Sequence, residues 1–172
     1  MALKYKFERA EKIISKLSPD ELRMLEKICK EIQVAEEKLF KAAEEILKRC
    51  EDVCEGLCCR NTQLDSIISL WDFIYLLTLE NSMRGRISEC LQEENIFYSS
   101  DCIFLENGTG PCLFPPAARP EVCITTFCSD EKTIKKEINL VKLKFIKLSW
   151  FILLRKPRAL KHFLSGIFKG KE

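Results

Sequence analysis

The sequence contains little glycine or proline, with only six of each among 172 residues. Because these residues are the usual interruptions of helices, long stretches of the chain are free to be helical. Gly-rich phosphate loops and the HExxH and GxSxG motifs are absent, so no local motif of a nucleotide-binding enzyme, zinc protease or serine hydrolase is present. The single histidine, His162, lies far from the cysteines in sequence, which disfavours a Cys–His catalytic pair. These absences favour a protein that is not an enzyme on its own.

Long uncharged apolar runs are also missing. The most apolar stretch, 138–154, is interrupted by three lysines and falls short of the ~20 uncharged residues that span a bilayer. The chain starts with charged residues and shows no secretory signal, so we expect a cytoplasmic protein that is soluble or peripheral to a membrane. Thiols stay reduced in that compartment and disulfide frameworks are rare there, so the ten cysteines point to metal or redox chemistry.

Charge is unevenly distributed although the net charge is only +2. Residues 61–131 carry 3 basic and 11 acidic side chains, whereas residues 132–172 carry 12 basic and 2 acidic ones. The simpler interpretation is that the two regions attract each other within one fold. The alternative is a basic face for an anionic membrane surface. No DNA- or RNA-reading motif accompanies the lysines, so a nucleic-acid partner is disfavoured.

A long helix is predicted to start at Ser18. This residue is a good helix cap, with proline at the first helical position and Glu21 three residues after the cap. Apolar residues then recur at alternating spacings of three and four: Leu25, Ile28, Ile32, Ala35, Leu39, Ala42 and Ile46. This heptad seam predicts one helix from near residue 19 to near residue 49.

A second seam follows Asp130, and Pro157 should end its helix. Its apolar residues are Ile134, Ile138, Val141, Phe145, Leu148 and Ile152. Two heptad-patterned helices that flank a loop-rich insert suggest an antiparallel pair within one chain. A homodimer or another protein partner, joined through these heptad helices, is the competing interpretation.

Shorter helices are expected at 5–16, from a Ser69 cap to about Glu80, at 83–95 and at 158–168. The predicted fold class is therefore mainly α, with the long helices packed around a loop-rich metal site. We expect a single domain over residues 1–172. Its parts are an N-terminal helical arm at 1–49, a cysteine-cluster core at 50–128 and basic C-terminal helices at 130–172.

Eight of the ten cysteines are clustered and are the predicted metal ligands: Cys50, Cys54, Cys58, Cys59, Cys102, Cys112, Cys123 and Cys128. Thiolates bind zinc or iron–sulfur clusters, and spacings of three or four residues can bring two sulfurs to one ion. A turn at Asn107-Gly108 could fold its segment back and present Cys102 and Cys112 together. The adjacent Cys58 and Cys59 side chains diverge, so one four-ligand ion does not account for all eight. Cys29 and Cys90 lie on helical patterns and are expected to be small buried hydrophobic residues.

The order of these cysteines and their neighbours resembles the YkgJ-type cysteine-cluster family. The resemblance covers residues 50–128 and rests on Cys54-Glu-Gly-Leu-Cys58-Cys59-Arg60, Ile68-Ser69-Leu70-x-Asp72, Cys102-Ile-Phe-Leu, Cys112 and Arg119-Pro120-x2-Cys123-x3-Phe127-Cys128. The resemblance implies a domain that chelates zinc or iron, and the sequence does not distinguish between these two metals. The guanidinium groups of Arg60 and Arg119, beside the cysteines, could offset thiolate charge.

The sequence therefore favours a metal-binding protein with an accessory or structural role. An iron–sulfur redox or group-transfer protein is the first alternative, because some larger proteins with similar clusters are described as protein-modifying methylases. A membrane-surface adaptor that uses the basic, apolar residues 138–168 is the second alternative.

Overall fold

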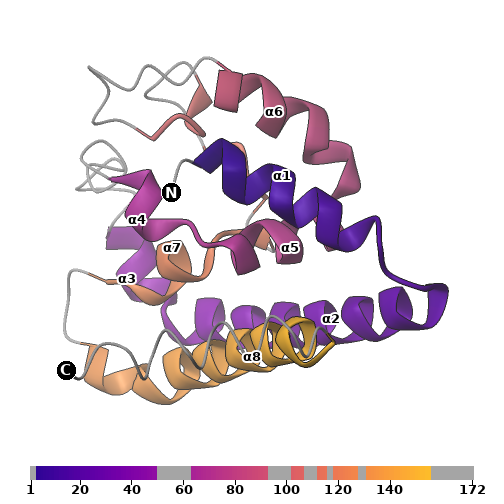
Figure 1. Ribbon diagram of the computed structural model, residues 1–172. Coiled ribbons are helices and arrows are strands. Elements are labelled where there is room, and N and C mark those ends of the chain that lie inside the picture. Colours follow the sequence, from indigo (N-terminus) through magenta and orange to yellow (C-terminus); the bar gives the residue numbers. More distant parts are fainter. Residues whose placement is uncertain are drawn as a thin grey trace, which may run out of the picture.

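The computed structural model describes residues 3–49, 63–92, 102–106, 112–115, 118–127 and 131–155, and these are mainly helical (Figure 1). The α-helices are α1 (Leu3–Ile14), α2 (Pro19–Ala42), α3 (Glu44–Arg49), α4 (Leu64–Ile67), α5 (Leu70–Leu79), α6 (Arg84–Gln92), α7 (Glu121–Thr125) and α8 (Lys135–Leu154). Short 3-10 helices lie at Asn81–Met83 and Glu131–Thr133. The mainly α fold class is confirmed. The final helix predicted at 158–168 lies outside the described residues.

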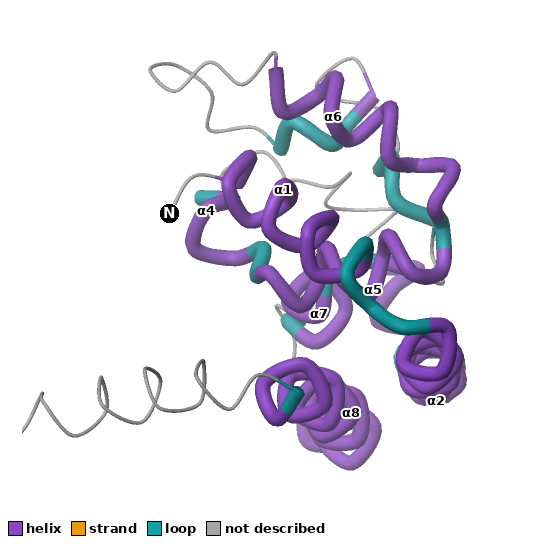
Figure 2. Tube along the Cα trace, turned by 45° about the vertical axis from the view of Figure 1, so that its right-hand side comes forward, coloured by secondary structure: helices purple, strands orange, loops and turns teal. Residues whose placement is uncertain are grey.

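Helices α2 and α8 form the predicted antiparallel pair. Glu31 of α2 accepts hydrogen bonds from Lys144 (2.9 Å) and Lys147 (2.8 Å) of α8, while Glu21 near the start of α2 pairs with Arg155 just after α8. Residue numbers thus fall along α2 as they rise along α8, and Figure 2 shows the two helices side by side. All six seam residues predicted for α8 are buried. Both heptad seams are used within one chain, so a homodimer would need other faces.

The second half of the first seam departs from the prediction. Regular helix ends at Ala42, and Ala43 (φ −98°, ψ 8°) separates α2 from α3, so the single helix expected to reach residue 49 is wrong. The backbone still turns helically there, because Leu47 N donates to Ala43 O at 2.9 Å. Ala43 is fully buried whereas the predicted seam residue Ala42 is exposed. The next buried residue after Leu39 is therefore Ala43, four positions further along, instead of the predicted Ala42, three positions further along.

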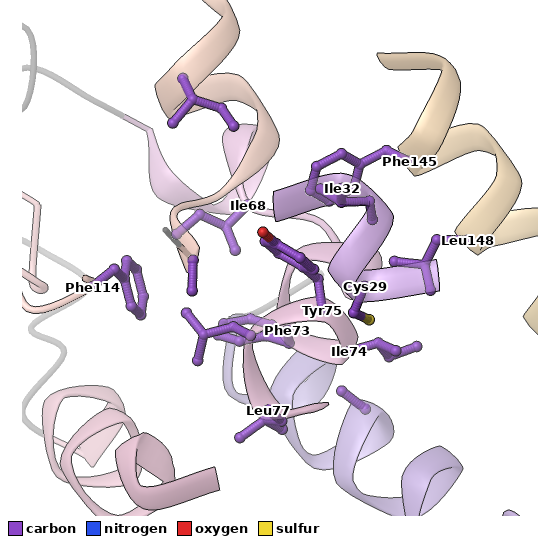
Figure 3. Close-up of a cluster of buried hydrophobic side chains, with 14 of the residues drawn as sticks. Cys29, Ile32, Ile68, Phe73, Ile74, Tyr75, Leu77, Phe114, Phe145 and Leu148 are labelled. Atoms are coloured by element: carbon purple, nitrogen blue, oxygen red, sulfur yellow. The ribbon is translucent and has the colours of Figure 1, made fainter. Parts of the chain in front are cut away.

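Helix α5 is the centre of the fold. Five consecutive apolar or aromatic side chains, from Phe73 to Leu77, are buried, as expected for a helix that is apolar all round. Phe73 packs edge-on against Phe7 of α1 at 5.5 Å between ring centres, and Tyr75 packs edge-on against Phe145 of α8 at 5.2 Å. In Figure 3, Phe73, Ile74 and Leu77 leave α5 in different directions. Helix α5 therefore separates α1 from the α2–α8 pair.

The predicted starts of α2 and α5 are confirmed in atomic detail. Ser18 N donates to Glu21 Oε2 at 2.8 Å and Glu21 N donates to Ser18 Oγ at 3.3 Å, which is a capping box. Ser69 forms the same arrangement with Asp72 at the start of α5. Local side-chain chemistry thus fixes both helix starts.

Within the described residues, no helix combines the length and apolar character needed to cross a membrane.

The α2–α8 seam predicts a contrast between two leucines of the same helix. Leu148→Ala should lower the free energy of unfolding by about 2 to 5 kcal/mol, because Leu148 is fully buried and its truncation leaves a cavity. Leu143→Ala should change it by only about 0.5 kcal/mol, because Leu143 is 59% exposed. Urea denaturation measures both. Equal losses would contradict the assignment of the two faces of α8.

Candidate metal centre

The structure describes three of the eight predicted ligands. Cys102 and Cys112 are partly buried and pack against the hydrophobic core, and Cys123 is exposed on α7. The other predicted ligands, and Arg60, lie outside the described residues: Cys50, Cys54, Cys58, Cys59 and Cys128. Among the residues that the structure does describe, no group of three or more His, Cys, Asp or Glu side chains could hold a metal ion. A metal centre would therefore need ligands from the undescribed segments.

The chain folds back between Cys102 and Cys112. Leu105 and Cys112 form an antiparallel β-bridge, and Leu113 N donates to Phe104 O at 2.7 Å. The Phe104 and Phe114 rings pack together at 4.6 Å between centres. The two cysteines are consequently carried on neighbouring segments. Asn107 and Gly108, where the turn was predicted, lie outside the described residues.

Asp72 fixes the position of the helix that carries Cys123. One carboxylate oxygen, Oδ2, accepts hydrogen bonds from Ser69 N (2.7 Å) and Ser69 Oγ (2.5 Å) at the start of α5. The other oxygen, Oδ1, accepts from Glu121 N (2.6 Å), the first residue of α7. Burial raises the pKa of Asp72 above its ordinary value, and the hydrogen bonds from Ser69 and Glu121 oppose that shift. Asp72 therefore joins two of the segments that carry the family resemblance, 49 residues apart in sequence.

Arg119 precedes α7 and is partly buried. Its Nε is buried and has no hydrogen-bond partner within the part of the chain that the structure describes. A buried guanidinium N–H without a partner costs free energy, so this position suits a nearby anion.

Cys29 occupies the core, as predicted. It is fully buried in α2, and burial raises the pKa of its thiol to about 12. Burial therefore favours the neutral thiol of Cys29 over the thiolate form that binds metal. Cys90 of α6 is partly buried and packs against the same core.

A buried carboxyl group in the core was not predicted from the sequence. Glu36 of α2 is 1% exposed, and Tyr75 Oη donates to its Oε2 at 2.8 Å. Its Oε1 has no hydrogen-bond partner among the described residues. Burial raises the pKa of Glu36 to about 8, against the lowering effect of the Tyr75 hydrogen bond, and the nearby Asp72 raises it further. At neutral pH Glu36 is therefore mainly protonated.

No protein-family model matches this chain, and neither a curated protein nor a solved structure resembles it significantly. The resemblance to the YkgJ-type family therefore stays a prediction carried by the residues quoted above.

The position of Asp72 predicts a large effect of its removal. Asp72→Ala should lower the free energy of unfolding by about 2 to 4 kcal/mol, because α5 loses half of its capping box and the N–H of Glu121 loses its acceptor. Asp65→Ala is the matched control, since Asp65 is exposed on the neighbouring helix α4. Thermal and urea denaturation measure both variants. Equal stability of the two variants would show that Asp72 does not anchor α7.

The buried Glu36 predicts an unusual pH dependence. Because its folded pKa is raised from 4.5 to about 8, its contribution to stability is complete below the unfolded pKa and is lost as pH rises through about 8. Glu36→Gln keeps an acceptor for Tyr75 and cannot ionise, so it should raise Tm relative to the native protein by roughly 2 to 8 °C near pH 9. Glu37→Gln, at the exposed neighbouring position, should leave the pH profile unchanged. If the difference in Tm between the native protein and Glu36→Gln stays constant from about pH 5 to pH 9, the raised pKa of Glu36 is refuted.

Proposed function

We propose that this protein binds a zinc ion or an iron–sulfur cluster through its clustered cysteines, in an accessory or structural role. The observation that supports this best is the pairing of Leu105 with Cys112, since it brings two predicted ligand segments together. The ligands would be drawn from the eight clustered cysteines, five of which lie in segments the structure does not describe. Helix α7, which carries Cys123, is attached to the central helix α5 through the hydrogen bond from Glu121 to Asp72.

The chemistry of the surroundings supports thiolate ligands in this region. Cys102 and Cys112 are partly shielded by the core, while Cys123 faces outward on α7. The buried Nε of Arg119 would compensate part of the negative charge of a thiolate group. When bound, zinc would add folding free energy to a loop-rich region, whereas an iron–sulfur cluster would also allow electron transfer. The absence of catalytic motifs from the sequence favours the structural role.

Metal analysis of protein purified without oxygen tests the proposal. We expect stoichiometric zinc in a colourless protein, or iron and sulfide in a brown one, and the second result would favour the redox alternative. Cys58→Ser and Cys59→Ser should lose metal and solubility. Cys90→Ser and Cys29→Ala should keep the metal, because these two residues belong to the α-helical core.

Two results would contradict the proposal. The first is a native protein without zinc or iron whose clustered cysteines are paired in disulfides. The second is equal metal content in all four variants, which would show that the division of the cysteines into metal ligands and core residues is wrong. Circular dichroism of each variant distinguishes the loss of a ligand from the loss of the fold.

A further inference from the structure

Helix α8 is apolar on two opposite faces. One face is the buried seam that includes Val141, Phe145 and Leu148. The other is an exposed stripe, hereafter the outer stripe, whose members are 51 to 59% exposed: Leu143, Ile146, Trp150 and Leu154. Their spacings of three, four and four residues place these side chains in one row along the helix. A helix that is apolar all round is normally buried all round, so an exposed row of this kind suggests a surface that covers it.

The outer stripe faces away from the rest of the described fold. At 100° per residue, its members lie opposite the seam that packs on α2 and α5. Figures 1 and 2 both show α8 at the periphery, with α2 beside it. The row from Leu143 to Leu154 is about 16 Å long, which suits contact along the helix rather than through a membrane.

Positive charge surrounds the outer stripe. Helix α8 contains five lysines and one glutamate. On the side toward α2, a groove between the two helices is lined by Lys27, Lys30, Lys38 and Lys144, with Glu31 as its one acidic lining residue among those the structure describes. Val34, also in this groove, is 51% exposed. The α2–α8 surface therefore combines exposed apolar side chains with an excess of lysines.

We propose that the outer stripe of α8 docks on an anionic phospholipid surface. Leucine, isoleucine and tryptophan side chains would enter the boundary between headgroups and acyl chains, where tryptophan is favoured. The lysines on α8 and in the α2–α8 groove would remain at the level of the anionic headgroups, each contributing attraction there. This inference is independent of the metal, because it uses none of the cysteines.

A second copy of the chain is a poorer occupant of the same face. A symmetric contact would place the same patch of each copy against the other, so two sets of α8 lysines would approach each other. Like charges so close together oppose such a contact. An anionic bilayer instead satisfies both the apolar row and the lysines.

Vesicle co-sedimentation of the full chain tests the proposal. The protein should bind phosphatidylcholine vesicles that contain phosphatidylglycerol, should bind pure phosphatidylcholine vesicles weakly, and should lose binding as salt is raised. The double variant Leu143→Ser/Trp150→Ser should bind the anionic vesicles at least about tenfold more weakly, because both removed side chains are apolar and exposed. The matched control is Tyr5→Ser/Met24→Ser, two apolar residues that are equally exposed on α1 and α2. It should bind as the native chain does.

Tryptophan fluorescence gives a second measurement. Trp150 is one of two tryptophans and is 52% exposed, so its emission should shift to the blue when anionic vesicles are added. Trp150→Phe should keep binding and lose most of this shift, which identifies the part of the chain that enters the lipid.

Three outcomes would overturn the proposal. Unchanged binding by Leu143→Ser/Trp150→Ser would assign membrane contact to another part of the chain. Equal binding to neutral and anionic vesicles would remove the role of the lysines. A native dimer that this double variant dissociates, detected by analytical ultracentrifugation, would show that a second copy covers the stripe.

Discussion

The burial of α5 is the constraint on which the described structure depends. Because this helix is apolar all round, other helices must cover it on every side. Helix α1 does so through the Phe7–Phe73 contact, and α8 does so through Phe145 against Tyr75. The hydrogen bond from Glu121 to Asp72 then attaches α7 to the start of the same helix. The segment that carries Cys123 is thus attached to the core through Asp72.

The elements predicted correctly from the sequence depend on local chemistry or on a regular repeat. The Ser18 and Ser69 caps have their partners three residues away, and the apolar repeat of α8 matches its buried face. The break after Ala42 is different, because helix propensity continues through it. What moves the buried position to Ala43 is packing against the rest of the fold, which no local pattern encodes.

Two further features could not be read from the sequence because identical residue types stand in different surroundings. Glu36 and Glu37 are neighbours in α2, yet one is buried against Tyr75 and the other is exposed. The seam of α8 was predicted, but the exposure of the other apolar residues in its outer stripe became evident only with α2 and α5 in place. For the candidate metal centre, the sequence supplied the eight cysteines, whereas the Asp72 attachment of α7 required the structure.

The protonated state of Glu36 has a thermodynamic consequence for any calorimetric study. A carboxyl group that holds its proton in the native state at neutral pH, and ionises near its ordinary pKa when exposed, releases that proton to the solvent on unfolding. The buffer takes up the released proton, and its heat of ionisation enters the measured enthalpy. Unfolding enthalpies of this protein near neutrality should therefore differ between phosphate and amine buffers, even where the unfolding temperature is the same.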